Sequence, residues 1–162
     1  DNLGWTLAGK RVLLLGSGGA ARGVIQPLLE AGPAELIVSG RTPWNVEKLA
    51  IAFKEHGPLT PRTHITLKGD CFDLVLNATS IGHDGQVLRL PPGIVHKDSA
   101  CYDLNYGKAS APFREWAGAQ GVGRVAEGLG MLVEQAAASF ALWHGRRPQT
   151  APVIRQLAGQ TS

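Results

Sequence analysis

The stretch that decides the fold is Lys-Arg-Val-Leu-Leu-Leu at residues 10–15, followed by Gly-Ser-Gly-Gly-Ala-Ala at residues 16–21. The first part is apolar with almost no alternation, which is typical of a strand buried on both faces of a sheet. Glycine then interrupts the run. Apolar residues at helical spacing follow over residues 20–31, and Gly32-Pro33 ends the predicted helix. A strand, a glycine turn and a helix in this order predict the first unit of a parallel sheet.

The rest of the chain repeats this alternation. We expect further strands at residues 36–39, 64–67, 72–77, 100–104 and 122–125, and further helices at residues 46–56, 111–120, 129–144 and 151–158. Strands and helices that alternate at this spacing predict a parallel sheet covered on both sides. The predicted class is α/β: a Rossmann-type, doubly wound, mostly parallel six-stranded sheet with helices on both faces. No repeat or low-complexity stretch divides the chain, so we expect one domain, residues 1–162.

Composition excludes several function classes. Hydrophobic residues make up 44% and charged residues 18%, which is ordinary for a globular protein. No apolar run approaches the roughly 20 residues of a membrane span, and the first residues lack the layout of a signal peptide. The net charge of +3 comes from scattered residues, without the basic stripe of a nucleic-acid-binding surface. Cys71 and Cys101 stand far apart without metal-ligand spacing, so we interpret them as reduced packing residues. We therefore expect a cytoplasmic protein that binds no membrane, nucleic acid or metal.

The glycine turn carries the first functional signal. Residues 16–21 fit the pattern G-x-G-x-x-A, and they lie between a predicted strand and a predicted helix, where this motif is meaningful. Gly16 allows the tight turn, Gly18 lets the backbone approach a diphosphate, and the small Ala21 lets helix and strand pack closely. The N–H groups and the dipole at the helix start attract phosphate. The turn therefore predicts a dinucleotide-binding domain.

The end of the second strand indicates which dinucleotide is bound. An NAD site usually has an acidic residue there, which accepts hydrogen bonds from the ribose hydroxyls. Here the sequence is Val-Ser-Gly-Arg-Thr at residues 38–42, and no carboxylate follows until Glu47. The guanidinium of Arg41 can pair with a 2′-phosphate in a two-pronged geometry, and Thr42 adds a hydroxyl donor. NADP is the predicted cofactor; the alternative interpretation is that Arg41 is solvated at a strand end.

Four blocks of the sequence, residues 16–22, 73–80, 102–106 and 128–136, resemble shikimate dehydrogenase. Enzymes of this family interconvert 3-dehydroshikimate and shikimate in aromatic amino-acid (chorismate) biosynthesis. The ending Leu-Trp-His-Gly at residues 142–145 is also similar, so the resemblance runs through nearly the whole chain. The block at residues 128–136 is the most specific, because no generic Rossmann domain requires it.

The resemblance implies roles for individual residues. The implied cofactor-binding residues are Gly16, Ser17, Gly18, Gly19, Ala20, Arg41, Thr42, Asn77, Ala78, Thr79, Ser80, Leu104, Gly128 and Met131. The implied substrate-binding residues are Tyr106 and Gln135, whose phenol and amide suit a ligand rich in hydroxyls. The family's Asn-Arg-Thr-x-x-Arg motif for the adenosine phosphate reads Gly-Arg-Thr-Pro-Trp-Asn at residues 40–45, so Asn45 replaces its second arginine. Trp44 is expected either to stack beside the adenine or to pack on its own helix.

The family's catalytic machinery is not found in this sequence. In the family, a Lys and Asp pair and the serines that hold the shikimate carboxylate belong to an N-terminal domain. Asp73, Asp103 and His83 are possible substitutes, but we interpret them as structural or solvated groups. The chain is therefore predicted to contain no catalytic residue and to bind NADP without turning over substrate. Its C-terminal helices, at about 129–158, are expected to pack toward the missing N-terminal domain, with a small-molecule substrate bound in the intact enzyme.

Three other interpretations stay open. The chain could come from a quinate/shikimate dehydrogenase that prefers NAD, although Arg41 and Thr42 stand where that enzyme should have an acid. It could be a non-catalytic nucleotide-binding module. It could also be the cofactor domain of a tetrahydrofolate dehydrogenase or a glutamyl-tRNA reductase, but those should lack the block at residues 128–135.

Overall fold

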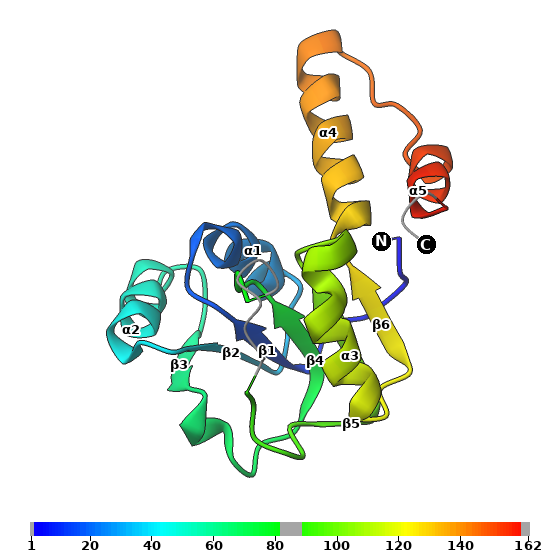
Figure 1. The fold of residues 1–162 in the computed structure, drawn as a ribbon. Coiled ribbons are helices and arrows are strands. Elements are labelled where there is room, and N and C mark those ends of the chain that lie inside the picture. Colours follow the sequence, from blue (N-terminus) through cyan, green and yellow to red (C-terminus); the bar gives the residue numbers. More distant parts are fainter. Residues whose placement is uncertain (1, 82–88, 160–162) are drawn as a thin grey trace.

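A six-stranded sheet forms the centre of the molecule (Figure 1), in a computed structural model that describes residues 2–81 and 89–159. The strands are β1 (Arg11–Leu15), β2 (Glu35–Gly40), β3 (Thr60–Thr63), β4 (Phe72–Asn77), β5 (Val95–Asp103) and β6 (Arg124–Glu127). They are arranged in the order β3-β2-β1-β4-β5-β6, and every adjacent pair is parallel. This is the strand order of a dinucleotide-binding Rossmann fold. The predicted fold class is confirmed.

Helices cover both faces of the sheet because successive side chains of each strand point to opposite sides. The helices are α1 (Gly19–Glu30), α2 (Pro43–Ala52), α3 (Ala111–Ala119), α4 (Leu129–His144) and α5 (Ala151–Ala158). On one face, Val12 and Leu14 of β1 pack in a core with α1 and α2. On the other, Leu13 and Leu15 pack in a second core to which α3 contributes. All four of these β1 side chains are fully buried, as the non-alternating run predicts.

The third strand lies elsewhere than predicted. We expected it at residues 64–67, but Thr60–Thr63 forms β3 and Ile65–Leu67 forms a single 3-10 turn. The apolar residues Ile65 and Leu67 suggested a strand, but both belong to the 3-10 turn. Leu67 is buried under the sheet, whereas Ile65 is 86% exposed. β3 is an edge strand with partly buried side chains, where Pro61 is tolerated despite having no N–H to donate.

The other predicted boundaries agree with the structure to different degrees. The elements at residues 72–77, 129–144 and 151–158 match β4, α4 and α5 residue for residue. The fifth strand begins five residues before its predicted start, at Val95, and β6 lies two residues beyond its predicted position. Cys71 and Cys101 are both free thiols, but only Cys101 is a packing residue, because Cys71 is exposed.

Helix α4 leads away from the sheet, and the chain then returns through α5 (Figure 1). The first turns of α4 contribute buried Leu129 and Val133, whereas Leu142 and Trp143 near its end are 84% and 82% exposed. Helix α5 contacts α4 and buries none of its residues. Within the described residues, no helix is both long and apolar enough to cross a membrane.

Candidate cofactor-binding site

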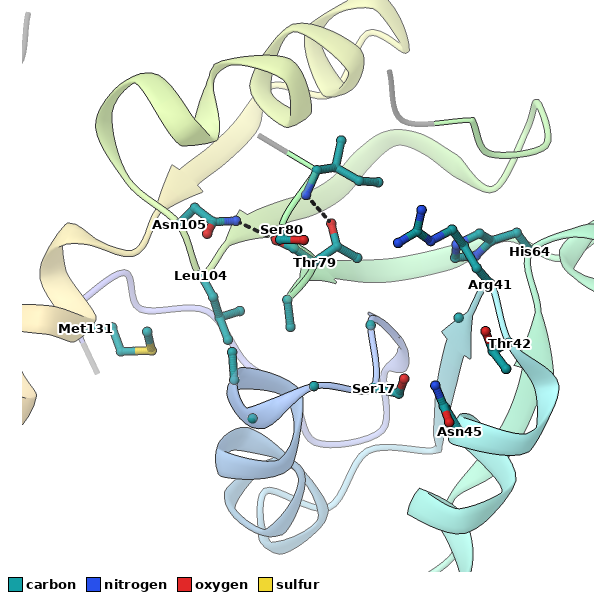
Figure 2. Close-up of a pocket in the computed structure, with 17 residues that line it drawn as sticks. Ser17, Arg41, Thr42, Asn45, His64, Thr79, Ser80, Leu104, Asn105 and Met131 are labelled. Carbon is teal, nitrogen blue, oxygen red and sulfur yellow. Dashed lines mark hydrogen bonds between the residues drawn. The ribbon is translucent and has the colours of Figure 1, made fainter. Parts of the chain in front are cut away.

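A cavity of about 520 Å³ lies at the carboxyl edge of the sheet, where the turns after β1, β2, β4 and β5 meet. Ligands of open α/β sheets bind at this edge, beside the point where the chain changes direction across the sheet. The change occurs here between β1 and β4, which are adjacent although two strands separate them in the sequence. Figure 2 shows the cavity as elongated, with Arg41 toward one end and Leu104 and Met131 toward the other.

The glycine turn forms the middle of the cavity wall. Gly16 has a φ of +110°, and its N–H donates to the Ser39 carbonyl at 2.7 Å. A Cβ on Gly16 would lie 2.7 Å from the Ala78 carbonyl oxygen, so no other residue fits this turn without a shift of the backbone. Gly18 is the N-cap of α1; it offers no capping side chain, and no acidic residue lies in the first helical turn. The N–H groups at the start of α1 are therefore available to an anion.

The turn after β2 forms one end of the cavity. Arg41, Thr42 and Asn45 line it, and Pro43 starts α2 immediately beyond (Figure 2). Trp44 points elsewhere: it is 59% exposed, and the Lys48 ammonium lies 4.9 Å from the centre of its ring. Trp44 therefore packs on its own helix, which is one of the two predicted arrangements.

His64 also lines this end of the cavity, and sequence reasoning missed it. Its Nδ1 is 3.0 Å from the buried Ser39 hydroxyl. Burial, and after it the positive charge of Arg41, lower the pKa of His64 below its usual value. The sequence pattern placed this residue in a strand, so nothing local indicated that it turns toward the end of β2.

A polar network supports the turn after β4. The Asn77 side chain donates to Asp103 at 3.0 Å and accepts from the N–H and hydroxyl of Thr79. The Asn105 amide bridges Asp103 and the Thr79 carbonyl. Burial raises the pKa of the fully buried Asp103 carboxyl, while the hydrogen bonds from Asn105 and Asn77 act in the opposite direction. Asn77 thus lies behind the cavity wall and fixes Thr79, which is part of the wall.

Gly128 has a similar supporting position at the other end. A Cβ there would come within 2.7 Å of the Leu104 carbonyl carbon and closer still to its oxygen, so only glycine lets α4 start against β5. Leu104 and Met131 line the cavity, whereas Gly128 lies behind them. Tyr106 is 48% exposed after β5 and Gln135 is exposed on α4, and neither lines the cavity.

Twelve of the fourteen residues predicted to bind cofactor line this one cavity, all except Asn77 and Gly128. Five further residues line the cavity without having been predicted to bind cofactor: Gly40, Asn45, His64, Ile81 and Asn105. The cavity volume is in the usual range for cofactor sites. A glycine cradle, open helix N–H groups and a cationic end fit a phosphate-rich dinucleotide. Among the described residues, no group of His, Cys, Asp and Glu is placed to hold a metal ion.

Comparison with protein families identifies the same family that the sequence motifs resemble. The model of shikimate / quinate 5-dehydrogenase matches residues 1–84, which include the glycine turn, and that of the shikimate 5′-dehydrogenase C-terminal domain matches residues 128–158. The chain belongs to the shikimate/quinate 5-dehydrogenase family. The C-terminal-domain model covers residues 128–135, the block that a tetrahydrofolate dehydrogenase or glutamyl-tRNA reductase cofactor domain should lack, and this match argues against both.

Individual members of the shikimate/quinate 5-dehydrogenase family are closely similar over almost the whole chain. The shikimate dehydrogenases (NADP(+)) of Dechloromonas aromatica and Nitrosospira multiformis are 51% and 50% identical, over 97% and 96% of this chain. The chain spans 57% of the length of each relative.

Two solved structures are also similar. One is an Ael1 enzyme from Pseudomonas putida, with 44% identity and a TM-score of 0.89 over 97% of this chain and 58% of that one. The other is shikimate 5-dehydrogenase from Thermus thermophilus in complex with shikimate, with 32% identity and a TM-score of 0.69 over 91% and 54%.

Proposed function

We propose that this chain is the NADP-binding portion of a shikimate dehydrogenase, an enzyme that reversibly reduces 3-dehydroshikimate to shikimate with NADPH. The observation that carries the proposal is the cavity itself, in which the start of α1 lies between Arg41 at one end and Leu104 and Met131 at the other. This arrangement matches a dinucleotide, whose diphosphate lies between the adenosine phosphate and the nicotinamide. The names of the relatives support NADP as that dinucleotide.

Each part of the cavity then has a binding role. The backbone N–H groups of residues 17–20 bind the diphosphate, since the helix start favours negative charge, and Gly16 forms the turn that presents them. Arg41 and Thr42 bind the 2′-phosphate with a charge-assisted pair and a hydroxyl. Residues 78–80 line the cofactor cleft, and Asn77 keeps this turn in place.

The other end of the cavity serves the reaction. A nicotinamide bound there supplies or accepts the hydride. Leu104 and Met131 form an apolar wall that orients the ring and excludes water, and Gly128 holds the backbone of Leu104 in position. Tyr106 and Gln135 are assigned to the substrate hydroxyls. Both side chains are exposed beyond the cavity, as groups that meet a substrate held mostly by another domain would be.

We assign the proton transfer at the substrate oxygen to residues outside these 162. Asp103 is fully buried and engaged by Asn77 and Asn105, and Asp73 accepts from the N–H of Arg11 at the start of β1, far from the carboxyl edge. His83 lies outside the described residues. The exposed apolar end of α4, with Leu142 and Trp143, suits a surface that another domain of the same enzyme covers. We expect the isolated chain to bind cofactor and to show no turnover.

Titration of the chain with NADPH and with NADH, followed by tryptophan fluorescence, tests the proposal. Trp44 lies two residues beyond Thr42, so occupation of this end should change its emission. We expect tight binding of NADPH and weak binding of NADH. Failure to bind either dinucleotide would refute the proposal, and so would a steady-state turnover by the 162 residues comparable to that of intact enzymes.

A second candidate function is that of a quinate/shikimate dehydrogenase that uses NAD. The observation in its favour is Asn45, a short neutral side chain at the cavity where the NADP motif has arginine. Equal affinity for NADH and NADPH in the titration would favour this candidate. A non-catalytic nucleotide-binding module is the third, and an upstream reading frame that encodes the family's catalytic Lys and Asp would exclude it.

A further inference from the structure

The end of the cavity that contains Arg41 has only one of the two arginines of the family motif, because Asn45 stands at the position of the other. A 2′-phosphate monoester carries close to two negative charges at neutral pH. Arg41 supplies one positive charge, and Asn45 supplies none at the position of the second arginine. If NADP binds here, part of the phosphate charge lacks a cationic partner from that motif.

We propose that His64 is the second cationic group for the 2′-phosphate and thereby sets the preference for NADP over NAD in this protein. The proposal rests on the function proposed above, and it adds a selectivity residue from outside the motif. Figure 2 shows the His64 and Arg41 side chains next to each other at the same end of the cavity.

The sheet register brings His64 to this place. Thr63, the last residue of β3, pairs with Gly40, the last residue of β2. The residues that follow each strand, His64 and Arg41, are therefore neighbours, although 22 residues separate them in the chain. The hydrogen bond between Nδ1 and the fully buried Ser39 hydroxyl fixes the ring and turns its Nε2 edge away from Ser39.

The surroundings of His64 make its charge responsive to an anion. Without one, burial and the nearby Arg41 hold its pKa below the usual value, so the ring is neutral near pH 7. A bound dianion reverses the local charge and favours the protonated ring. The Ser39 hydroxyl can then accept from Nδ1–H, because a hydroxyl serves as donor or acceptor, while Nε2–H donates to the phosphate.

Within residues 2–81 and 89–159, the other charged side chains near β3 contact different groups. Glu47 of α2 and Arg62 of β3 line a separate hollow with Thr66, and Arg62 donates to the Thr66 carbonyl. Arg41 is the charged neighbour that affects the His64 pKa. Binding of the 2′-phosphate takes up a proton, so the affinity for NADP rises as the pH falls through the pKa of His64 in the complex and levels off below its lower pKa in the free chain.

The test compares the dissociation constants of oxidised NADP and NAD, measured by calorimetry at two pH values. These values, about 6.5 and 8.5, lie on either side of the range in which a histidine bound to an anion titrates. In the parent chain, the preference for NADP should be larger at the lower pH. The His64→Gln variant should lose about tenfold to a hundredfold in NADP affinity there, the value of a hydrogen bond between charged groups. Its NAD affinity should stay the same, and its preference should vary less with pH. His56→Gln is the matched control, because His56 is an exposed histidine just beyond α2, outside the cavity.

Two further experiments distinguish an effect of the His64 charge from a structural effect of its replacement. Adding Asn45→Arg to His64→Gln should restore the NADP preference and make it independent of histidine titration. In the unmutated chain, the pKa of His64 measured by NMR should rise with adenosine 2′,5′-bisphosphate and not with adenosine 5′-monophosphate. The inference is overturned if NADP binds while the His64→Gln variant keeps the parent preference at both pH values, or if the bisphosphate leaves the His64 pKa unchanged. Failure of the parent chain to bind NADP at all would instead refute the proposed function.

Discussion

The substitution Gly18→Ala separates binding from folding. Gly18 has φ −81° and ψ −167°, an extended conformation open to any residue, and a Cβ there meets no atom within 4 Å. The methyl group therefore causes no clash. It restricts the unfolded chain, which stabilises by about 0.4–1 kcal/mol, but alanine is less favourable than glycine at the N-cap of α1 by a similar amount, so Tm should stay within about 4 °C of the parent value.

The effect on cofactor binding is a clear loss of affinity. The glycine at this place in the motif lets the diphosphate approach the backbone, and the added methyl group holds it away from the N–H groups of α1. One lost hydrogen bond to a charged group costs about 1.5–3 kcal/mol. Binding of NADPH and of NADH should both weaken, by about tenfold to 150-fold for each bond lost.

Thermal unfolding followed by circular dichroism and fluorescence titration give the two readouts. Gly23→Ala is the matched control: Gly23 is exposed on α1, nothing surrounds its Cβ position, and both stability and affinity should be preserved or improved. Gly16→Ala is the structural contrast, because its Cβ would clash with Ala78 and its φ is positive, so Tm should fall. A Gly18→Ala variant that binds NADPH as tightly as the parent would refute the assignment of the diphosphate to this turn.

Three further variants test other parts of the proposed function. Arg41→Gln should weaken NADPH binding by about tenfold to 150-fold and leave NADH binding unchanged; an equal loss for both dinucleotides in the titration would contradict its pairing with the 2′-phosphate. Gly128→Ala should lower the free energy of unfolding by about 1–3 kcal/mol through overpacking, seen as a fall in Tm that Gly118→Ala, with open space around it, does not cause. Changing Leu142 and Trp143 to serine together should leave Tm unchanged in thermal unfolding, because both side chains are more than 80% exposed; a large fall in Tm would show that they pack within this chain.

The elements that the sequence predicted well are those with a local physical signal. The strand at residues 72–77 lies in the middle of the sheet, so its side chains are apolar on both sides. The helix at residues 129–144 has a long apolar pattern that ends at Gly145 in the left-handed conformation. The strand Thr60–Thr63 gave no such signal, because an edge strand with half-buried side chains needs little apolar sequence.

The residues of the candidate site also differ in whether the local sequence indicates their place. The glycine turn and Arg41 were predictable because both follow directly from consecutive residues at strand ends. His64 was not, since its place depends on the pairing of β3 with β2 and on a hydrogen bond to Ser39. The supporting positions of Asn77 and Gly128 depend on contacts with residues that are 24 to 26 positions away in the chain. The resemblance predicts that these two bind cofactor, and in the structure neither lines the cavity.

A crystal structure of the chain grown with NADP would locate the bound dinucleotide. We expect electron density for the diphosphate against the N–H groups at the start of α1, and for the 2′-phosphate beside Arg41. Density for the dinucleotide elsewhere, or a glycine turn without ligand at saturating NADP, would contradict it.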